Sequence, residues 1–255
     1  MFNILRILYR FFNKIYCSLF GMIIKFFTEY SSETPIENII ILGRGKSLQY
    51  FFKNYKEFEH IKHIVLANFQ GDDLNSKTIL SLKNKTIHFM LSRIEPTIPI
   101  SQILKLKIGK VFFAKPIKLK EDSSSNRVLF SGNLYGTKVN YLTDIQEKYL
   151  KFCAGTGLYA IINSIESWNI KNVYLFGFDF YSTDYHDGKQ HFEIRERVSI
   201  FKKPEKSIID TFDPNHYGVD KPAFLSYVSL KKDVNFFIHT LADLEEKYKN
   251  LKFLI

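Results

Sequence analysis

The sequence predicts an α/β protein built around a mostly parallel sheet. Short, continuously apolar runs typical of buried strands alternate with segments typical of helices, which is the pattern of parallel sheets covered by helices on both faces. Glycines or polar side chains follow directly after several of the apolar runs. Because open parallel sheets bind ligands at the carboxyl ends of their strands, we expect a functional site at that edge.

Composition narrows the class of protein further. A length of 255 residues with 45% hydrophobic content suffices for one core and a small appendage. The two cysteines, Cys17 and Cys153, form no disulfide framework and fit no metal-site spacing, which favours a reducing compartment. The net charge of +10 favours an anionic partner such as a membrane surface, a nucleotide or a nucleic acid.

Residues 1–30 are predicted to form a basic amphipathic helix in the membrane interface. Within residues 1–27, polar and basic residues recur every three or four positions along one stripe, and Phe, Ile, Leu, Tyr and Met fill the rest. The longest uncharged run, Ile15–Ile24, has ten residues and is too short to span a bilayer. A helix that covers the protein's own core or an oligomer seam is the alternative. The interface helix predicts a cytoplasmic protein, peripheral on the inner face of the cytoplasmic membrane.

The first strand, Ile36–Leu42, leads into a glycine turn at residues 43–47 and then a helix. A strand, a glycine turn and a helix N-terminus suit a phosphate group, because backbone N–H groups point at it. The turn is not a P-loop, which needs glycine at Ile40, and the third glycine of a dinucleotide fingerprint is replaced by Leu48. A tight turn without a ligand is the alternative.

Further buried strands end in polar residues at the same predicted edge. His63–Ala67 is followed by Asn68 and Gln70, and Thr86–Leu91 is followed by Ser92 and Arg93. Farther along the chain, we expect strands at Lys110–Ala114 and Arg127–Phe130 and a helix at Thr143–Phe152.

The stretch of residues 153–185 shows the strongest pattern. A Gly-Thr-Gly turn opens an apolar helix near Leu158–Trp168, which leads to a fully apolar strand at Val173–Phe178. Asp179 and the tyrosines Tyr181 and Tyr185 follow the end of this strand. They are therefore predicted to stand in the crevice where such sheets bind ligands.

Residues 182–215 are polar and long for a connection, and we interpret them as a lid or flexible loop. The acidic and histidine side chains there favour a solvated charge cluster over a metal site: Asp184, His186, Asp187 and His191. An apolar stripe then predicts a helix over residues 234–248, and Leu251–Ile255 predicts a final strand. Residues 36–181 and 216–255 would together form one domain.

Four motifs resemble, in the same order, those of the bacterial sialyltransferases of glycosyltransferase family 42. These are a Gly-x-Gly-x-Ser-Leu turn, an Asn followed closely by Gln, a Thr-Gly-hydrophobic-Tyr helix start, and a Gly-x-Asp-Phe-Tyr strand end with a second Tyr shortly after. The matching residues are Gly43, Gly45, Ser47, Leu48, Asn68, Gln70, Thr156, Gly157, Leu158, Tyr159, Gly177, Asp179, Phe180, Tyr181 and Tyr185. The resemblance covers most of residues 36–217 in outline and is dense only in residues 149–185.

This resemblance implies a single Rossmann-like nucleotide-binding domain, a GT-A-like variant. It would catalyse inverting, metal-independent transfer of sialic acid, or a related nonulosonic acid or Kdo, from a CMP-sugar donor to a glycan hydroxyl. No cofactor is implied. The implied donor-binding residues are Gly43, Arg44, Gly45, Ser47, Asn68, Gln70, Thr156, Gly157 and Asp179.

The resemblance also implies catalytic roles. Tyr181 and Tyr185 would hydrogen-bond the departing phosphate in place of a divalent cation. The family carries a His-Tyr pair and, a few residues later, the histidine that acts as general base. Here the pair is His216-Tyr217 and the later position is Asp220, so either His216 or Asp220 would be the base.

The chain departs from the family at Cys153, where the family has an arginine, and after its third strand. Two alternatives remain: an NTP-dependent, pyrophosphokinase-like transferase, suggested by Gly45-Lys46-Ser47, and a non-catalytic, membrane-docked relative of the fold. The partners we expect are the CMP-sugar donor, a glycan or glycolipid acceptor of bacterial surface lipopolysaccharide-type synthesis, and a membrane surface through residues 1–27. A homo-oligomer is compatible with the family, and no nucleic acid is expected.

Overall fold

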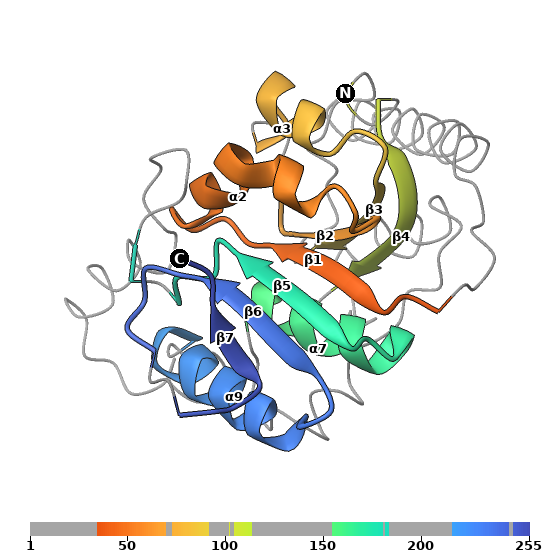
Figure 1. Ribbon diagram of the computed structural model, residues 1–255. Helices are drawn as coiled ribbons and strands as arrows, with labels where there is room; N and C mark the ends of the chain where they lie inside the picture. Colours follow the sequence, from red (N-terminus) through yellow and green to blue (C-terminus); the bar gives the residue numbers. More distant parts are fainter. Residues whose placement is uncertain are drawn as a thin grey trace, which may run out of the picture.

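The structure, a computed structural model, describes residues 35–69, 73–91, 102, 105–113, 155–180, 182–183, 216–244 and 247–255. Seven strands form one sheet in the order β4-β3-β2-β1-β5-β6-β7, and all neighbouring strands run parallel (Figure 1). The strands are β1 Asn38–Leu42, β2 His63–Ala67, β3 Thr86–Leu91, β4 Lys107–Phe113, β5 Asn172–Phe176, β6 Asn235–His239 and β7 Leu251–Phe253.

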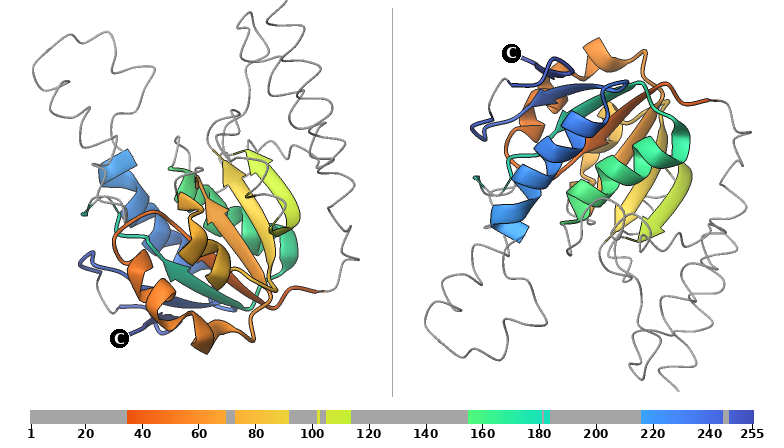
Figure 2. Two further views of the ribbon diagram at one scale, coloured as in Figure 1. Left: turned by 90° about the horizontal axis from the view of Figure 1, so that it is seen from above. Right: turned by 90° about the horizontal axis from the view of Figure 1, so that it is seen from below.

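Helices cover both faces of the sheet (Figure 2). One face carries α2 (Leu48–Asn54), the 3-10 helix η1 (Tyr55–Phe58) and α3 (Ser76–Ser81); the other carries α7 (Thr156–Trp168) and α9 (His216–Leu230). Successive strand residues point to opposite faces, so Ile40 and Leu42 pack in the core under α2 while Ile39 and Ile41 pack in the core under α7 and α9. The predicted α/β class with a parallel sheet is confirmed.

The strands predicted at His63–Ala67 and Thr86–Leu91 are confirmed with the same bounds. Four others are present with shifted bounds. β1 and β4 begin at Asn38 and Lys107, β5 ends at Phe176 rather than Phe178, and β7 ends at Phe253 rather than Ile255. Strand β5 ends early because Gly177 takes a left-handed conformation with φ of 77°, which turns the chain out of the sheet.

The helix predicted over residues 234–248 is wrong. Residues 235–239 form β6, in which Phe236 and Ile238 are buried while Phe237 is partly exposed. A short apolar run is compatible with a helix or with a strand. Here it forms a strand because it can pair in parallel with β5. The helix α9 was not predicted, because Gly218 and Pro222 within it argue against a helix.

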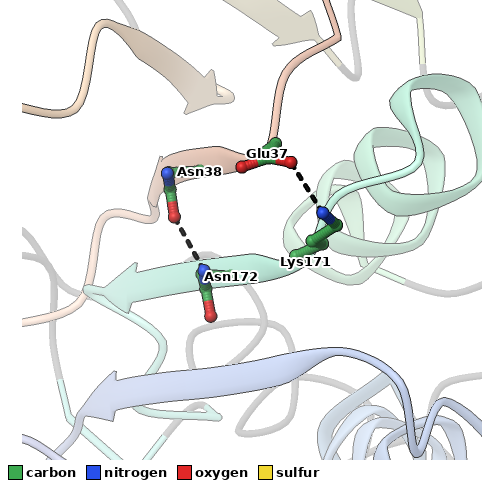
Figure 3. A network of polar contacts seen from close by, with 4 residues as sticks. All are labelled: Glu37, Asn38, Lys171 and Asn172. Atoms are coloured by element: carbon green, nitrogen blue, oxygen red, sulfur yellow. Dashed lines mark hydrogen bonds and ion pairs between the residues drawn. The ribbon is translucent and has the colours of Figure 1, made fainter.

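Asparagines at the first position of three neighbouring strands form a ladder at the amino edge of the sheet. The Asn172 side-chain amide donates to Asn38 Oδ1 at 2.8 Å (Figure 3), and that of Asn235 donates to Asn172 Oδ1 at 3.0 Å. One position earlier, Lys171 and Glu37 form an ion pair at 2.6 Å. These pairs join β1, β5 and β6 in register before the apolar part of the strands begins.

Several predictions fall outside the described residues: the interface helix of residues 1–30, the strand Arg127–Phe130, the helix Thr143–Phe152 and all of the lid except residues 182 and 183. In the part of the chain that the structure describes, no helix is both long and apolar enough to cross a membrane.

Candidate functional site

The sheet order reverses between β1 and β5. From β1 the chain adds β2, β3 and β4 to one side, and β5, β6 and β7 lie on the other (Figure 1). Ligands of open α/β sheets bind beyond the carboxyl ends of the strands at such a point. Two segments meet there: the turn of residues 43–47 after β1 and the strand end of residues 177–180 after β5.

The two segments are in direct backbone contact. Gly43 N–H donates to Phe176 O at 2.7 Å, and Gly45 N–H donates to Gly177 O at 2.9 Å. A Cβ atom on Gly43 would lie 2.4 Å from Gly177 O, and one on Gly45 would lie 2.5 Å from Asp179 Oδ2. The glycines of the turn are therefore required for this close packing.

Asp179 holds the carboxyl edge together through its buried carboxylate, with 3% of the residue exposed. Its Oδ2 accepts hydrogen bonds from Ser47 N–H at 2.9 Å and from the Thr183 hydroxyl at 2.8 Å, and its Oδ1 accepts from Leu241 N–H at 3.0 Å. In return, Gly177 N–H donates to Ser47 Oγ at 3.0 Å. One side chain thus joins the start of α2 to the segments that follow β5 and β6.

These contacts change the interpretation of the glycine turn. The sequence assigns its N–H groups to a phosphate, but in the structure those of Gly43, Gly45, Lys46 and Ser47 donate to Phe176 O, Gly177 O, Thr183 Oγ1 and Asp179 Oδ2. The amides are used to pack the edge. Binding of the CMP-sugar by these residues stays a prediction. It would require other atoms of the turn, or a rearrangement of the turn that frees its N–H groups.

Arg44, in the same turn, forms an ion pair with Asp73 from the connection between β2 and α3. Arg44 Nε lies 3.0 Å from Asp73 Oδ2, and the side chains are 12% and 0% exposed. Removing one partner of a buried pair leaves an uncompensated charge. Sequence reasoning missed Asp73, because a single acidic residue in a connection forms no pattern.

The start of α7 is tied to α9 by Asp220. Both carboxylate oxygens of Asp220 accept from Gly155 N–H, at 3.0 and 3.1 Å, and the residue is 5% exposed. The N–H groups of Thr156 and Gly157, in the first turn of α7, have no partner inside the helix and carry the positive end of its dipole. Both residues are partly exposed, so this turn presents backbone donors at the carboxyl edge.

His216 is the first residue of α9, four positions before Asp220. Residues four apart share one helix face, so position 216 lies one turn from the contact between α9 and the start of α7. Asn68, another predicted donor ligand, follows β2 at the same edge in a left-handed conformation (φ 59°), and its N–H donates to Met90 O at 2.6 Å.

The structure therefore gathers most of the predicted donor-binding residues at the carboxyl edge: Gly43, Arg44, Gly45, Ser47, Asn68, Thr156, Gly157 and Asp179. Gln70, Tyr181 and Tyr185 lie outside the described residues, as do the acidic and histidine residues of the lid. Within the described residues, no group of three or more His, Cys, Asp or Glu side chains is placed to hold a metal ion.

Comparison with known proteins finds no family model, no curated protein and no solved structure that matches this chain. The geometry of the carboxyl edge and the motifs that meet there are therefore the evidence for the function of this protein.

Proposed function

We propose that this protein is an inverting glycosyltransferase that moves an acidic nine-carbon sugar, or the related Kdo, from a CMP donor to a glycan hydroxyl. One observation carries the proposal. The motifs that resemble glycosyltransferase family 42 are distant in sequence, yet Ser47 of the first motif and Asp179 of the last are hydrogen-bonded across 132 residues. They meet where the strand order reverses, the place at which Rossmann-like sheets bind nucleotides.

The first turn of α7 suits such a donor. A CMP-sugar of this class carries a phosphate and a sugar carboxylate, both negative. Backbone N–H groups at a helix N-terminus attract anions through hydrogen bonds and the helix dipole. The amides of Thr156 and Gly157 lie in the first turn of α7 and would donate these hydrogen bonds. Those of the glycine turn already donate to other groups of the protein.

In the proposed reaction, a base removes the proton of the acceptor hydroxyl as its oxygen attacks the anomeric carbon from the face opposite CMP. The bond to the phosphate oxygen breaks, its electron pair leaves with CMP, and the configuration inverts. Phenol groups of Tyr181 and Tyr185 would donate hydrogen bonds to the phosphate as its charge grows. We assign the base to His216, because the Asp220 carboxylate is buried and bound to Gly155 N–H.

Ligand-dependent thermal stability tests the donor class. A ligand that binds only the folded state stabilises it by about 2.7 kcal/mol at 100 times its dissociation constant. We expect CMP and CDP to raise the unfolding midpoint in the absence of magnesium, and ATP and GTP to leave it unchanged. A magnesium-dependent shift with ATP or GTP would instead favour a pyrophosphokinase-like transferase. A flat response to all four would favour a non-catalytic relative.

Substitution tests the assigned roles. We expect Tyr181→Phe and His216→Ala each to lower the transfer rate by about two to three orders of magnitude, since each removes one group that acts in the transition state. The thermal midpoint should stay near the wild-type value. Matched controls are Tyr174→Phe, in the middle of β5, and His60→Ala, an exposed residue at the opposite edge. Wild-type turnover by either active-site variant would refute its role.

A further inference from the structure

The edge of the sheet opposite the candidate site is strongly basic. Six of the seven strands have at least one lysine among the four residues before them; one such lysine for each of β2 to β7 is Lys62, Lys83, Lys105, Lys171, Lys232 and Lys249. All six are exposed. Because the strands are parallel, these positions share the amino edge of the sheet. We call them the amino-edge lysines.

The asymmetry between the two edges is large. The four-residue segments before the strands contain nine lysines and three acidic residues, whereas the segments of up to four residues after the strands contain four basic and three acidic residues. Only Lys85 of the nine is buried, where its ammonium donates to the carbonyls of Phe58 and Ile61. Excess positive charge on one face attracts an extended anionic surface.

Exposed leucines stand beside these lysines. The described residues include four exposed large apolar side chains, and two of them, Leu80 at 58% and Leu230 at 64%, lie near the ends of α3 and α9 that reach the amino edge. Leu230 directly precedes Lys231, and Leu80 is three residues before Lys83. Lysines that flank exposed apolar side chains suit a lipid surface, where the ammonium groups meet headgroups and the leucines enter the acyl boundary.

The chain also enters β1 from this edge, through Pro35, Ile36 and Glu37. Residues 1–34 are therefore attached to the domain on the same side as the amino-edge lysines. The sequence independently predicts a basic amphipathic interface helix in that segment. Both features favour one partner on one side of the molecule.

We propose that the amino edge of the sheet docks on an anionic phospholipid surface, with the amino-edge lysines against the headgroups and the carboxyl edge turned away from the bilayer. The docking surface is formed by the folded domain and acts in addition to residues 1–34. It does not depend on the proposed reaction, since binding is measured without substrate.

The test uses the full chain and sedimentation with phosphatidylcholine vesicles, with and without phosphatidylglycerol. A lysine beside an anionic membrane contributes about a fivefold factor in affinity. The triple variant Lys83→Gln, Lys232→Gln, Lys249→Gln should therefore bind the phosphatidylglycerol vesicles about 100-fold more weakly. The matched control Lys46→Gln, Lys77→Gln, Lys110→Gln removes the same charge from exposed positions away from the amino edge and should bind within about threefold of the wild type.

A second pair of variants tests the apolar contribution. Leu80→Ser with Leu230→Ser should weaken binding about tenfold through lost apolar burial, and Leu241→Ser with Ile255→Ser, which are exposed elsewhere, should not. Three outcomes would overturn the proposal: equal losses in the two lysine triples, wild-type affinity of the amino-edge triple, or an amino-edge triple that loses binding to RNA or DNA but not to vesicles.

Discussion

At the scale of single residues, Asp179 determines how the carboxyl edge is assembled. A buried carboxylate is stable only when hydrogen bonds replace its hydration. Asp179 receives them from Ser47 N–H, Leu241 N–H and the Thr183 hydroxyl. These three groups lie before α2, after β5 and after β6. The buried side chain therefore fixes the relative position of the segments that would surround the CMP-sugar.

We expect Asp179→Asn to lower the free energy of unfolding by about 2–4 kcal/mol. The asparagine amide keeps the shape of the carboxylate but has no charge. Its NH2 group would replace one oxygen and face N–H or O–H groups, and it cannot accept hydrogen bonds from them. Urea unfolding followed by circular dichroism would measure the change. Asp243→Asn makes the same chemical change at an exposed position and should stay within about 0.5 kcal/mol of the wild type. Equal stability of the two variants would show that the hydrogen bonds of Asp179 are dispensable.

The sequence was sufficient to select Ser47 and Asp179 but not to say what they do. Ser47 lies in the glycine turn and Asp179 follows a strand end, and both match motifs of the family that the chain resembles. Their mutual hydrogen bond depends on the packing of two loops, which no local pattern encodes. The same holds for the Arg44–Asp73 pair and for Asp220, whose partner Gly155 lies 65 residues away.

At the scale of elements, buried parallel strands were predictable because they are short, continuous apolar runs with few other solutions. Helix α9 was not predictable, since its apolar residues do not line up on one face and it contains a proline. It is held by its environment: Phe224, Tyr227 and Val228 pack against the sheet, and Asp220 ties it to α7. Tertiary contacts of this kind override local preference.

A chain of hydrogen bonds between two histidines joins β2, β3 and β4 near the C-terminal end of α7. His88 Nδ1 accepts from Lys110 N–H at 2.9 Å, so its proton lies on Nε2, which donates to His63 Nδ1 at 3.1 Å. His88 is 2% exposed and packs against Trp168. Burial is the main cause that lowers the pKa of His88 to about 3, and the nearby charges of His63 and Lys110 lower it further. The pKa of His63 is also lowered, mainly by burial and then by the charge of Lys107.

This pair should make the protein sensitive to acid. Because both pKa values are below 6.5 in the folded state, the unfolded chain binds more protons below that pH, and the free energy of unfolding falls. His88 alone should contribute roughly 1 kcal/mol for each pH unit below about 6.5. Urea unfolding between pH 7.5 and 5 would measure the slope, which should be flatter in His88→Gln and unchanged in His60→Gln. Identical slopes in His88→Gln and the wild type would exclude the pair as the source.

At the scale of the whole molecule, the length of the parallel strands separates the two proposed sites. The proposed donor site lies beyond the carboxyl ends, and the amino-edge lysines lie before the amino ends. Five residues of strand span about 17 Å. A domain docked on lipid by its amino edge therefore holds the proposed site at least that far from the headgroups, and its acceptor must reach across the gap.

This orientation leads to an expectation about the acceptor, which rests on both the proposed reaction and the proposed docking. On anionic vesicles, we expect transfer to a glycolipid with an extended oligosaccharide and little transfer to one whose acceptor sugar is attached directly at the headgroup, because only the former spans roughly 17 Å. The same two glycans released from their lipids should be used at similar rates, which separates reach from recognition. The protein could transfer equally to both glycolipids on vesicles while it still binds CMP and still requires the amino-edge lysines for docking. That result would show that the carboxyl edge does not face away from the bilayer.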